Sequence, residues 1–256
     1  IEHRLDMVLP FVDKVFHVGD KKVVGITDKE SYLKEQSAPI SDVCHEFCGK
    51  LPVFSLSDVS FSVKERDILK GVTFDIPKSS RTVLLGENGC GKSTLLKIIK
   101  GIVQPDSGEV RYGTRVSVGY YDQSVATLDA NKDILSEIYD DFPEYELSRL
   151  RKIAGVFLFR GDDVFKKISS LSGGEKARVM LMKLMLRHDN LLLLDEPFSA
   201  LDYLTRLSMR EWLLEQWERE QKTVLFITHD VEEAVFLSSR ILVVEETPIT
   251  HLKSIE

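Results

Sequence analysis

Cysteine is scarce in this chain of 256 residues. The three cysteines, Cys44, Cys48 and Cys90, are too few for a disulfide framework, so we expect a reducing compartment. Cys44 and Cys48, together with His45, are residue types that bind metals. A structural zinc site normally needs four ligands, however, and no second pair lies nearby in the sequence. We therefore favour cysteines without a metal, with Cys90 as a small space-filling residue rather than a redox sensor.

The sequence also lacks long apolar runs and an excess of positive charge. No window reaches the roughly 18 apolar residues that a helix needs to span a bilayer. The most apolar stretches, such as 191–194 and 224–227, are short and bounded by charged residues, which is typical of buried strands. The net charge of -7 argues against non-specific binding to nucleic acid, which requires a basic face. If the protein acts at a membrane, we expect other subunits or domains to supply the spanning helices.

An alternation of strands and helices begins at residue 53 and predicts an α/β fold. Residues 53–63 and 68–76 have alternating patterns that predict an antiparallel pair, and 111–121 continues the β region. Further strands are predicted at 81–85, 191–195, 223–228 and 240–244. Helices are predicted at 92–100, 173–188, 203–219 and 231–238, with helical periodicity also across 130–168. Alternating elements of this kind indicate a mostly parallel sheet with helices on both faces.

A glycine-rich loop carries the strongest single motif. Its residues are Gly86, Glu87, Asn88, Gly89, Cys90, Gly91, Lys92, Ser93 and Thr94. The pattern of Gly, four residues and Gly-Lys-Ser lies between a predicted strand and a predicted helix, which is the context of a phosphate-binding loop. Glycine lets backbone N–H groups point inward, and the positive end of the helix favours an anion. We expect Lys92 to reach the β- and γ-phosphates, Ser93 to bind Mg²⁺, and Thr94 to contact the α-phosphate.

Two carboxylates follow the apolar strand at 191–194. Asp195 and Glu196 are thereby placed at the edge of the sheet where ligands bind in such folds. We expect Asp195 to hold Mg²⁺ through water and Glu196 to polarise an attacking water molecule. Phosphoryl transfer depends on an in-line nucleophile and on neutralising the developing charge, so the positions of these two acids matter more than covalent chemistry.

A further motif resembles that of a known family. Residues 171–175, Leu-Ser-Gly-Gly-Glu, precede a predicted helix, and together with the two motifs above they resemble the signature of the ATP-binding cassette family. The resemblance implies that Ser172, Gly173 and Gly174 close over the γ-phosphate of a nucleotide held by a partner's glycine-rich loop. Each pocket would then need two cassettes arranged head to tail, either as a homodimer or with a tandem paralogue, and would bind ATP with Mg²⁺.

Three more residues continue the resemblance in the family's order. Gln123 matches the residue that contacts Mg²⁺ and the attacking water, Asp202 in 199–202 matches a loop at the dimer interface, and His229 matches a histidine that contacts the γ-phosphate. Glu196, His229 and Gln123 are therefore the expected catalytic residues. The implied fold is a P-loop NTPase core with a mostly parallel sheet, an antiparallel β subdomain and a helical signature subdomain, over about residues 53–246.

One position departs from the family. Cassettes usually stack adenine on an aromatic residue just after the first strand, whereas the matching position here is Val63. Phe61 lies two residues earlier on the same face of the strand, where it either stacks on the base or belongs to the core. The sequence therefore leaves the preference for ATP over GTP open.

Different segments of the sequence resemble two different branches of the family. Residues 110–197 are similar to cassettes that act on ribosomes without a membrane partner, the ABC-F branch. From Phe198 onward, 198–202 and 228–237 resemble importer ATPases for nitrate, sulfonate or pyrimidine-type solutes. We favour the importer interpretation, which implies a permease partner, a peripheral place on the cytoplasmic face of the membrane, and no nucleic-acid partner. A ribosome-associated ATPase is the alternative, and a stand-alone cassette is a third possibility.

The start of the sequence resembles a later part of it. Residues 3–18 align without gaps with 229–244, and both blocks have the pattern of a histidine, a short helix, a basic residue and a strand. We interpret 1–26 as the tail of an upstream cassette in a longer chain, against the alternative of a chance match, and expect a hairpin at 14–25. The expected domains are then this tail, a linker at 27–52, the cassette at 53–246 and a C-terminal tail at 247–256.

Overall fold

The structure, a computed structural model, describes residues 14–19, 22–28, 52–122 and 128–255. It separates the chain into two units, Ile1–Cys48 and Gly49–Glu256. In the first unit, β1 (Lys14–Gly19) pairs antiparallel with β2 (Lys22–Asp28), which confirms the predicted hairpin. The second strand continues past residue 26, where the upstream tail was expected to end. The expected helix before residue 14, the cysteines Cys44 and Cys48, and the linker from 29 to 51 lie outside the described residues.

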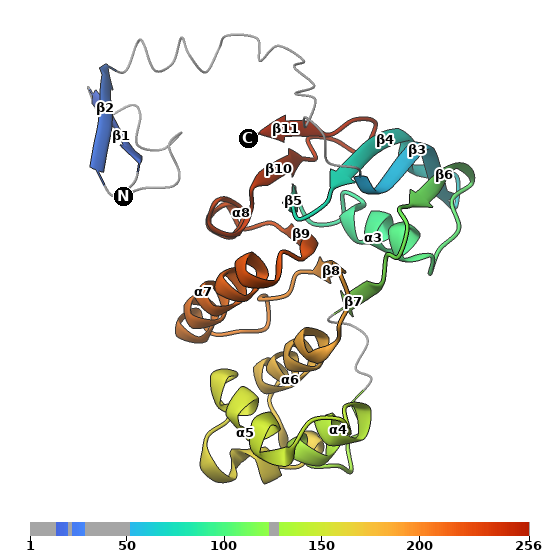
Figure 1. The fold of residues 1–256 in the computed structure, drawn as a ribbon. Helices are drawn as coiled ribbons and strands as arrows, with labels where there is room; N and C mark the ends of the chain where they lie inside the picture. The colour runs from blue at the N-terminus through green and yellow to red at the C-terminus, as the bar shows by residue number, and fades with distance from the viewer. Residues whose placement is uncertain (1–13, 20–21, 29–51, 123–127, 256) are drawn as a thin grey trace. The chain divides into compact units, whose positions relative to one another are not determined.

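The second unit is built on a six-stranded sheet (Figure 1). Its strands are β5 (Arg81–Leu85), β7 (Val118–Asp122), β8 (Leu191–Asp195), β9 (Thr223–Thr228), β10 (Arg240–Val243) and β11 (Lys253–Ile255). They lie in the order β11-β10-β5-β9-β8-β7, and all neighbours are parallel except β11, which runs antiparallel to β10. The mostly parallel sheet predicted from the sequence is confirmed.

Both faces of this sheet are covered, which explains the uninterrupted apolar strands. Every residue of β8 and of β9 is buried. Successive side chains of a strand point to opposite faces, so Leu191 and Leu193 enter one core cluster while Leu192 and Leu194 enter the other. Burial on two sides is what a parallel sheet requires, and it accounts for strands that are apolar at every position.

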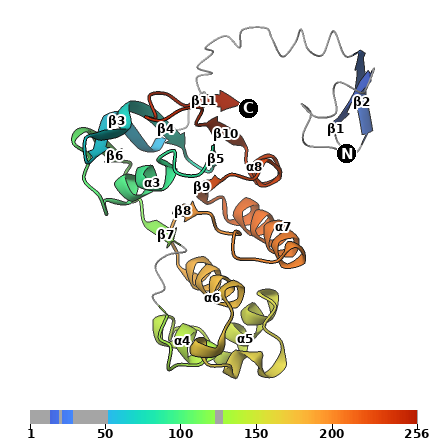
Figure 2. The same ribbon diagram turned by 180° about the vertical axis from the view of Figure 1, so that it is seen from behind.

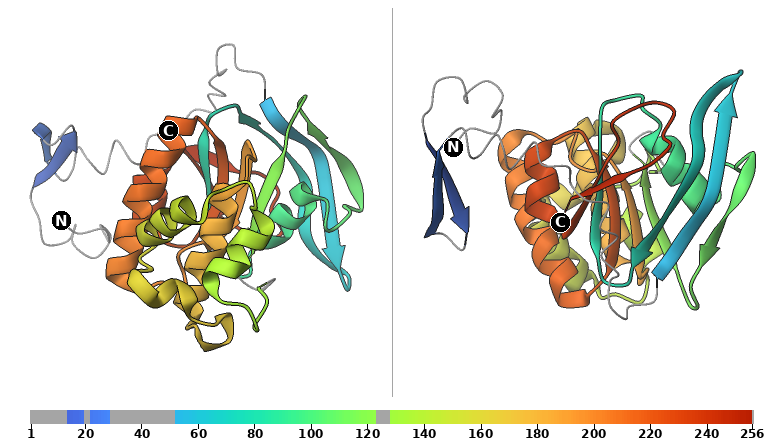
Figure 3. Two further views of the ribbon diagram at one scale, coloured as in Figure 1. Left: turned by 60° about the horizontal axis from the view of Figure 1, so that its bottom comes forward. Right: turned by 90° about the horizontal axis from the view of Figure 1, so that it is seen from above.

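An antiparallel sheet and one helix cover the first face. The strands β3 (Pro52–Val63), β4 (Arg66–Pro77) and β6 (Ser107–Tyr112) form a sheet in the order β4-β3-β6. Helix α3 (Lys92–Lys100) lies between the two sheets, as the right-hand view of Figure 3 shows edge-on. Leu95, Leu96 and Ile99 of this helix are buried in the same cluster as Phe54 of β3.

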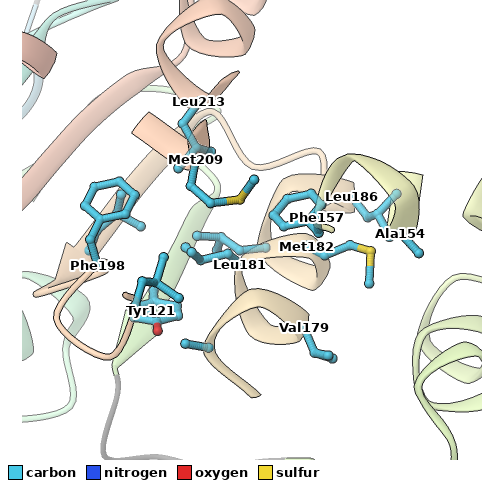
Figure 4. Close-up of a cluster of buried hydrophobic side chains, with 14 of the residues drawn as sticks. Tyr121, Ala154, Phe157, Val179, Leu181, Met182, Leu186, Phe198, Met209 and Leu213 are labelled. Carbon is cyan, nitrogen blue, oxygen red and sulfur yellow. The ribbon is translucent and has the colours of Figure 1, made fainter. Parts of the chain in front are cut away.

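Helices α6 (Gly173–Leu186), α7 (Tyr203–Glu220) and α8 (Val231–Leu237) cover the second face of the sheet. Figure 2 shows these helices from the side opposite to Figure 1. A smaller helical part lies at the end of α6 and comprises α4 (Ile134–Asp141), α5 (Leu147–Val156), η2 (Gly161–Phe165) and η3 (Ile168–Ser170). Figure 4 shows buried side chains between this part and the sheet: Phe157 at the end of α5, Met182 of α6, Tyr121 of β7 and Phe198 after β8. The predicted antiparallel and helical subdomains are thus both present.

Two segments differ from the expectations. Residues 111–121 do not form one β region, because β6 belongs to the antiparallel sheet and β7 to the parallel one. Residues 247–255, expected as a tail outside the domain, return to it: Ile249 exchanges backbone hydrogen bonds of 2.9 Å with Ile68 and Lys70 of β4, and β11 extends the parallel sheet. Neither segment carries a periodicity that would reveal these long-range partners.

The buried side chain of Ile249 tests whether this returning segment stabilises the domain. Ile249 is 1% exposed, so Ile249→Ala is expected to lower the free energy of unfolding by about 2–5 kcal/mol through lost burial and a residual cavity. Urea unfolding followed by tryptophan fluorescence measures it. Ile255→Ala is the matched control, since Ile255 is 45% exposed and its truncation should cost less than about 0.5 kcal/mol. Equal stability of the two variants would show that the segment is not part of the folded domain.

Candidate functional site

The glycine-rich loop connects the end of β5 to the start of α3. Gly91 has a φ of 106°, and a Cβ at this position would lie 2.8 Å from Cγ2 of Ile68, so a side chain is excluded by both conformation and space. Lys92 is 5% exposed, and its ammonium donates to the carbonyls of Gly86 and Glu87 at 2.6 and 2.7 Å. The lysine therefore places a buried positive charge at the mouth of its own loop.

Unpaired backbone donors at the start of α3 fit a phosphate. Among the described residues, the N–H groups of Gly91, Lys92 and Ser93 donate to no protein acceptor. Three such donors at the positive end of a helix, beside a buried ammonium, form the environment that phosphate oxygens prefer. The phosphate-binding role predicted for this loop is thus compatible with its geometry.

A hydroxyl and a carboxylate meet next to the loop. Ser93 Oγ donates to Oδ1 of Asp195 at 3.0 Å, which joins the first turn of α3 to the end of β8. Burial raises the pKa of Asp195, and the negative charges of Asp122 and Glu196 add to this effect, while the Ser93 hydrogen bond and Lys97 oppose it. Asp122 of β7 lies beside Asp195 of β8 in the strand register. Nζ of Lys97 lies 3.7 Å from Oδ2 of Asp122.

These oxygen ligands suit Mg²⁺ in kind. Mg²⁺ is usually held by one or two protein oxygens together with waters and substrate phosphates, so Ser93 and Asp195 would be sufficient from this chain. Within the described ranges no cluster of three or more His, Cys, Asp or Glu side chains forms an all-protein metal site. The donor set therefore fits a metal that arrives with a phosphate ligand.

Glu196 and His229 form a second pair at the same edge. Nδ1 of His229 lies 2.9 Å from Oε2 and 3.0 Å from Oε1 of Glu196, so the ring can donate to the carboxylate. Glu196 directly follows β8 in a left-handed conformation, with a φ of 48°, and His229 directly follows β9. Strain at a non-glycine residue is tolerated where the surrounding structure requires it, here where a carboxylate is turned toward the histidine.

The predicted signature caps the start of α6. Ser172 Oγ accepts from Glu175 N, while Glu175 Oε2 accepts from Ser172 N at 2.9 Å, and this backbone bond lowers the pKa of Glu175. A Cβ on Gly174 would lie 2.9 Å from the carbonyl oxygen of Ala200, so the signature packs closely against the 199–202 loop. Within the described part of the chain, no hydrogen bond connects Ser172 to residues 86–94.

Three further residues singled out in the sequence are Gln123, Val63 and Phe61. Gln123 lies outside the described residues. Val63 is 46% exposed, whereas Phe61 packs against the core cluster beneath β3, which favours the core role for Phe61. The sequence did not single out Asp122, Arg210 or Glu233, which are buried charged residues near the site. Asp122 ends a strand and could have been noticed, but no local pattern distinguishes Arg210 from an exposed arginine.

Known proteins resemble this chain in both sequence and fold. A family model described as ABC transporter matches residues 69–199. The putative ATP-binding protein YdiF of Bacillus subtilis is 42% identical over 179 residues, which is 70% of this chain and 27% of that protein. The aliphatic sulfonates import ATP-binding protein SsuB 3 of Rhodococcus jostii is 37% identical over 194 residues, covering 75% of this chain and 70% of that protein.

A solved structure has the same fold. The dimeric structure of MJ0796, a bacterial ABC transporter cassette, matches with a TM-score of 0.68 and 23% identity, over 79% of this chain and 98% of that chain. The sequence relatives divide by length: this chain matches 28% of the ATP-binding protein Uup of Escherichia coli but 77% of SsuB 2 of Streptomyces avermitilis. The chain thus spans about a quarter of the longer relatives and about three quarters of the shorter ones.

Lys92 is the residue whose removal tests the loop most directly. Lys92→Ala is expected to weaken ATP binding by about a hundredfold, because charge-assisted hydrogen bonds to phosphate contribute about 1.5–3 kcal/mol each. Isothermal titration calorimetry with ATP measures the dissociation constant. Lys78→Ala, which removes an exposed lysine before β5, is the control and should leave it unchanged. Retention of wild-type affinity in Lys92→Ala would remove the loop from the site.

Proposed function

Because the chain belongs to the ABC transporter family, we propose that it is an ATP-binding cassette that hydrolyses ATP jointly with a second cassette. One observation carries this proposal: the loop of Lys92, the Ser93–Asp195 pair and the Glu196–His229 pair all follow the carboxyl ends of neighbouring parallel strands. Ligands of α/β proteins bind at this edge of the sheet. The arrangement brings phosphate binding, metal ligands and a candidate base to one place.

Each residue has a defined task in this proposal. The N–H groups of residues 91–93 and the Lys92 ammonium bind the β- and γ-phosphates. Ser93 and Asp195, with Gln123 as the family resemblance implies, would hold Mg²⁺, which supplies positive charge where charge develops during phosphoryl transfer. Glu196 orients and polarises the attacking water, and His229 holds the Glu196 carboxylate and contacts the γ-phosphate. Thr94 takes the α-phosphate.

The second cassette completes the pocket. Ser172, Gly173 and Gly174 begin α6 with backbone donors and a capped helix end, yet Ser172 makes no hydrogen bond to the loop at 86–94 within the described part of the chain. We therefore place these residues over the γ-phosphate bound by a partner cassette, a homodimer mate or a tandem paralogue. The dimeric state of the MJ0796 cassette, whose fold this chain shares, is in keeping with such an assembly.

For the cellular role we propose ATP-driven import through a membrane permease. The importer ATPases SsuB 3 and SsuB 2 are 37% and 38% identical to this chain over about three quarters of it, in keeping with the resemblance of 198–202 and 228–237 to importer ATPases. Among the described residues, no helix is both long enough and apolar enough to cross a bilayer. The permease would supply that part, with this chain bound peripherally on its cytoplasmic side. The 42% identity to YdiF favours a second candidate, a ribosome-associated ATPase of the ABC-F type.

The role of Glu196 can be tested without knowing the transported solute. Glu196→Gln keeps the size of the side chain but removes the carboxylate that polarises water, so we expect ATP hydrolysis to fall by about a hundredfold or more while ATP binding persists. Phosphate release measures hydrolysis, and size-exclusion chromatography with ATP measures trapping of a dimer. Glu211→Gln, an exposed glutamate on α7, is the control. Turnover within a few-fold of wild type would exclude Glu196 as the base.

The two cellular roles predict different binding partners. With the Glu196→Gln protein and ATP, import predicts co-sedimentation with membrane fractions, and a ribosomal role predicts co-sedimentation with ribosomes. Lys92→Ala is the matched negative control in both experiments because it should not close on ATP. Binding to ribosomes alone, with none to membranes, would replace the import proposal by the alternative.

A further inference from the structure

The side chain of His229 is largely exposed and is therefore only weakly fixed by packing against its neighbours. It is 54% exposed, and its ring nitrogen Nδ1 lies 2.9 Å from the carboxylate of Glu196. Its position therefore depends on the backbone that carries it, a two-residue connection between the last residue of β9, Thr228, and the first residue of α8, Val231. A helix of this length contributes little rigidity by itself, so the connection needs support from elsewhere.

A buried hydrogen-bond network supplies that support on both sides of His229. Thr228, before it, has a fully buried hydroxyl that donates to Oε2 of Glu233 at 2.7 Å and accepts from the N–H of Asp230 at 3.0 Å. Asp230, after it, caps α8 by accepting from the N–H groups of Glu232 and Glu233 at 2.8 and 3.2 Å. The peptide of His229 is thus fixed through both of its neighbours.

Arg210 of α7 joins the two carboxylates of this network. Its guanidinium donates to Oε1 of Glu233 at 2.6 Å and to Oδ2 of Asp230 at 3.1 Å. The side chains of Arg210 and Glu233 are each 5% exposed, so their charges depend on one another and not on water. Both bonds come from one nitrogen, Nη2, so Arg210 holds the two carboxylates close to a single point.

Resting on the proposed function, we infer that Arg210 is a positioning residue that sets His229 against Glu196. It touches neither substrate nor reacting atoms, but acts through Asp230 and Glu233 on the residue between β9 and α8. Arg206, one turn earlier on α7, donates to the carbonyl of Leu201 at 3.2 Å and lies 3.8 Å from Asp230. The support of His229 is therefore continuous with the 199–202 loop, which the family resemblance places at the interface between cassettes.

The test compares Arg210→Met with Arg219→Met in the full chain. Arg219 lies on the same helix with a side chain that is 66% exposed, so its loss controls for removing a charge from α7. For Arg210→Met we expect kcat for ATP to fall by about tenfold to a hundredfold, the cost of misplacing a catalytic group, with the ATP dissociation constant changed less than about threefold. When His229 is already replaced by Ala, Arg210→Met should change kcat by less than about twofold, because Arg210 is inferred to act through His229.

A second variant separates positioning from folding. Arg210→Met combined with Glu233→Gln leaves no unpaired buried charge and keeps an acceptor for the Thr228 hydroxyl, so it should fold even where Arg210→Met does not. If Arg210 positions His229, kcat stays low in this folded double variant. Recovery of wild-type kcat, or an equal loss of kcat with and without His229, would overturn the inference.

A spectroscopic measurement decides the matter independently of ATP hydrolysis. The chain has six histidines, and the ring signals of His229 in a long-range proton–nitrogen spectrum are those lost in His229→Ala. They should move in the Arg210→Met, Glu233→Gln protein and stay in place in Arg219→Met. Unchanged His229 signals in the double variant would refute the positioning role, whereas a wild-type chain without ATPase activity would refute the proposed function and leave this measurement valid.

Discussion

The parallel register of β5, β9 and β8 is the constraint on which the candidate site depends. Leu85, Thr228 and Asp195 are the last residues of these strands and lie at one edge of the sheet, so whatever follows the strands in sequence is brought together in space. The phosphate loop follows the first strand, His229 the second and Glu196 the third. Because β8 and β9 are buried on both faces, a shift of one residue would move each of their side chains into the opposite core cluster and disperse the site at the same time.

Much of this arrangement could be predicted from the sequence because its signals are local. The helix at 92–100 and the strands at 81–85, 191–195 and 223–228 have the predicted bounds, since each is marked by apolar residues next to glycine, proline or charged residues. The motifs lie directly beside these elements. The contacts between Ser93 and Asp195 and between Glu196 and His229 therefore follow once the sheet is known to be parallel.

The parts that could not be predicted depend on partners far apart in the sequence. The assignment of β6 and β7 to different sheets is decided by which strand each one meets, and residues near Ile249 pair with β4 about 180 positions earlier. Arg210 and Glu233 are similar: a charged residue on a helix is usually solvated, and only the approach of α7 to α8 shows that these two are buried together. Long-range packing, rather than local preference, determines these features.

The order of strands also has a consequence for how the chain is made. β5 precedes all other strands of the main sheet in the sequence, yet its two neighbours, β9 and β10, come only after β7 and β8. A nascent chain that ends before residue 223 holds the glycine-rich loop on a strand with neither neighbour in place. The strand that carries the glycine-rich loop therefore gains both of its neighbours only after residue 243 has been synthesised, and shorter nascent chains keep apolar strand edges open to chaperones and proteases.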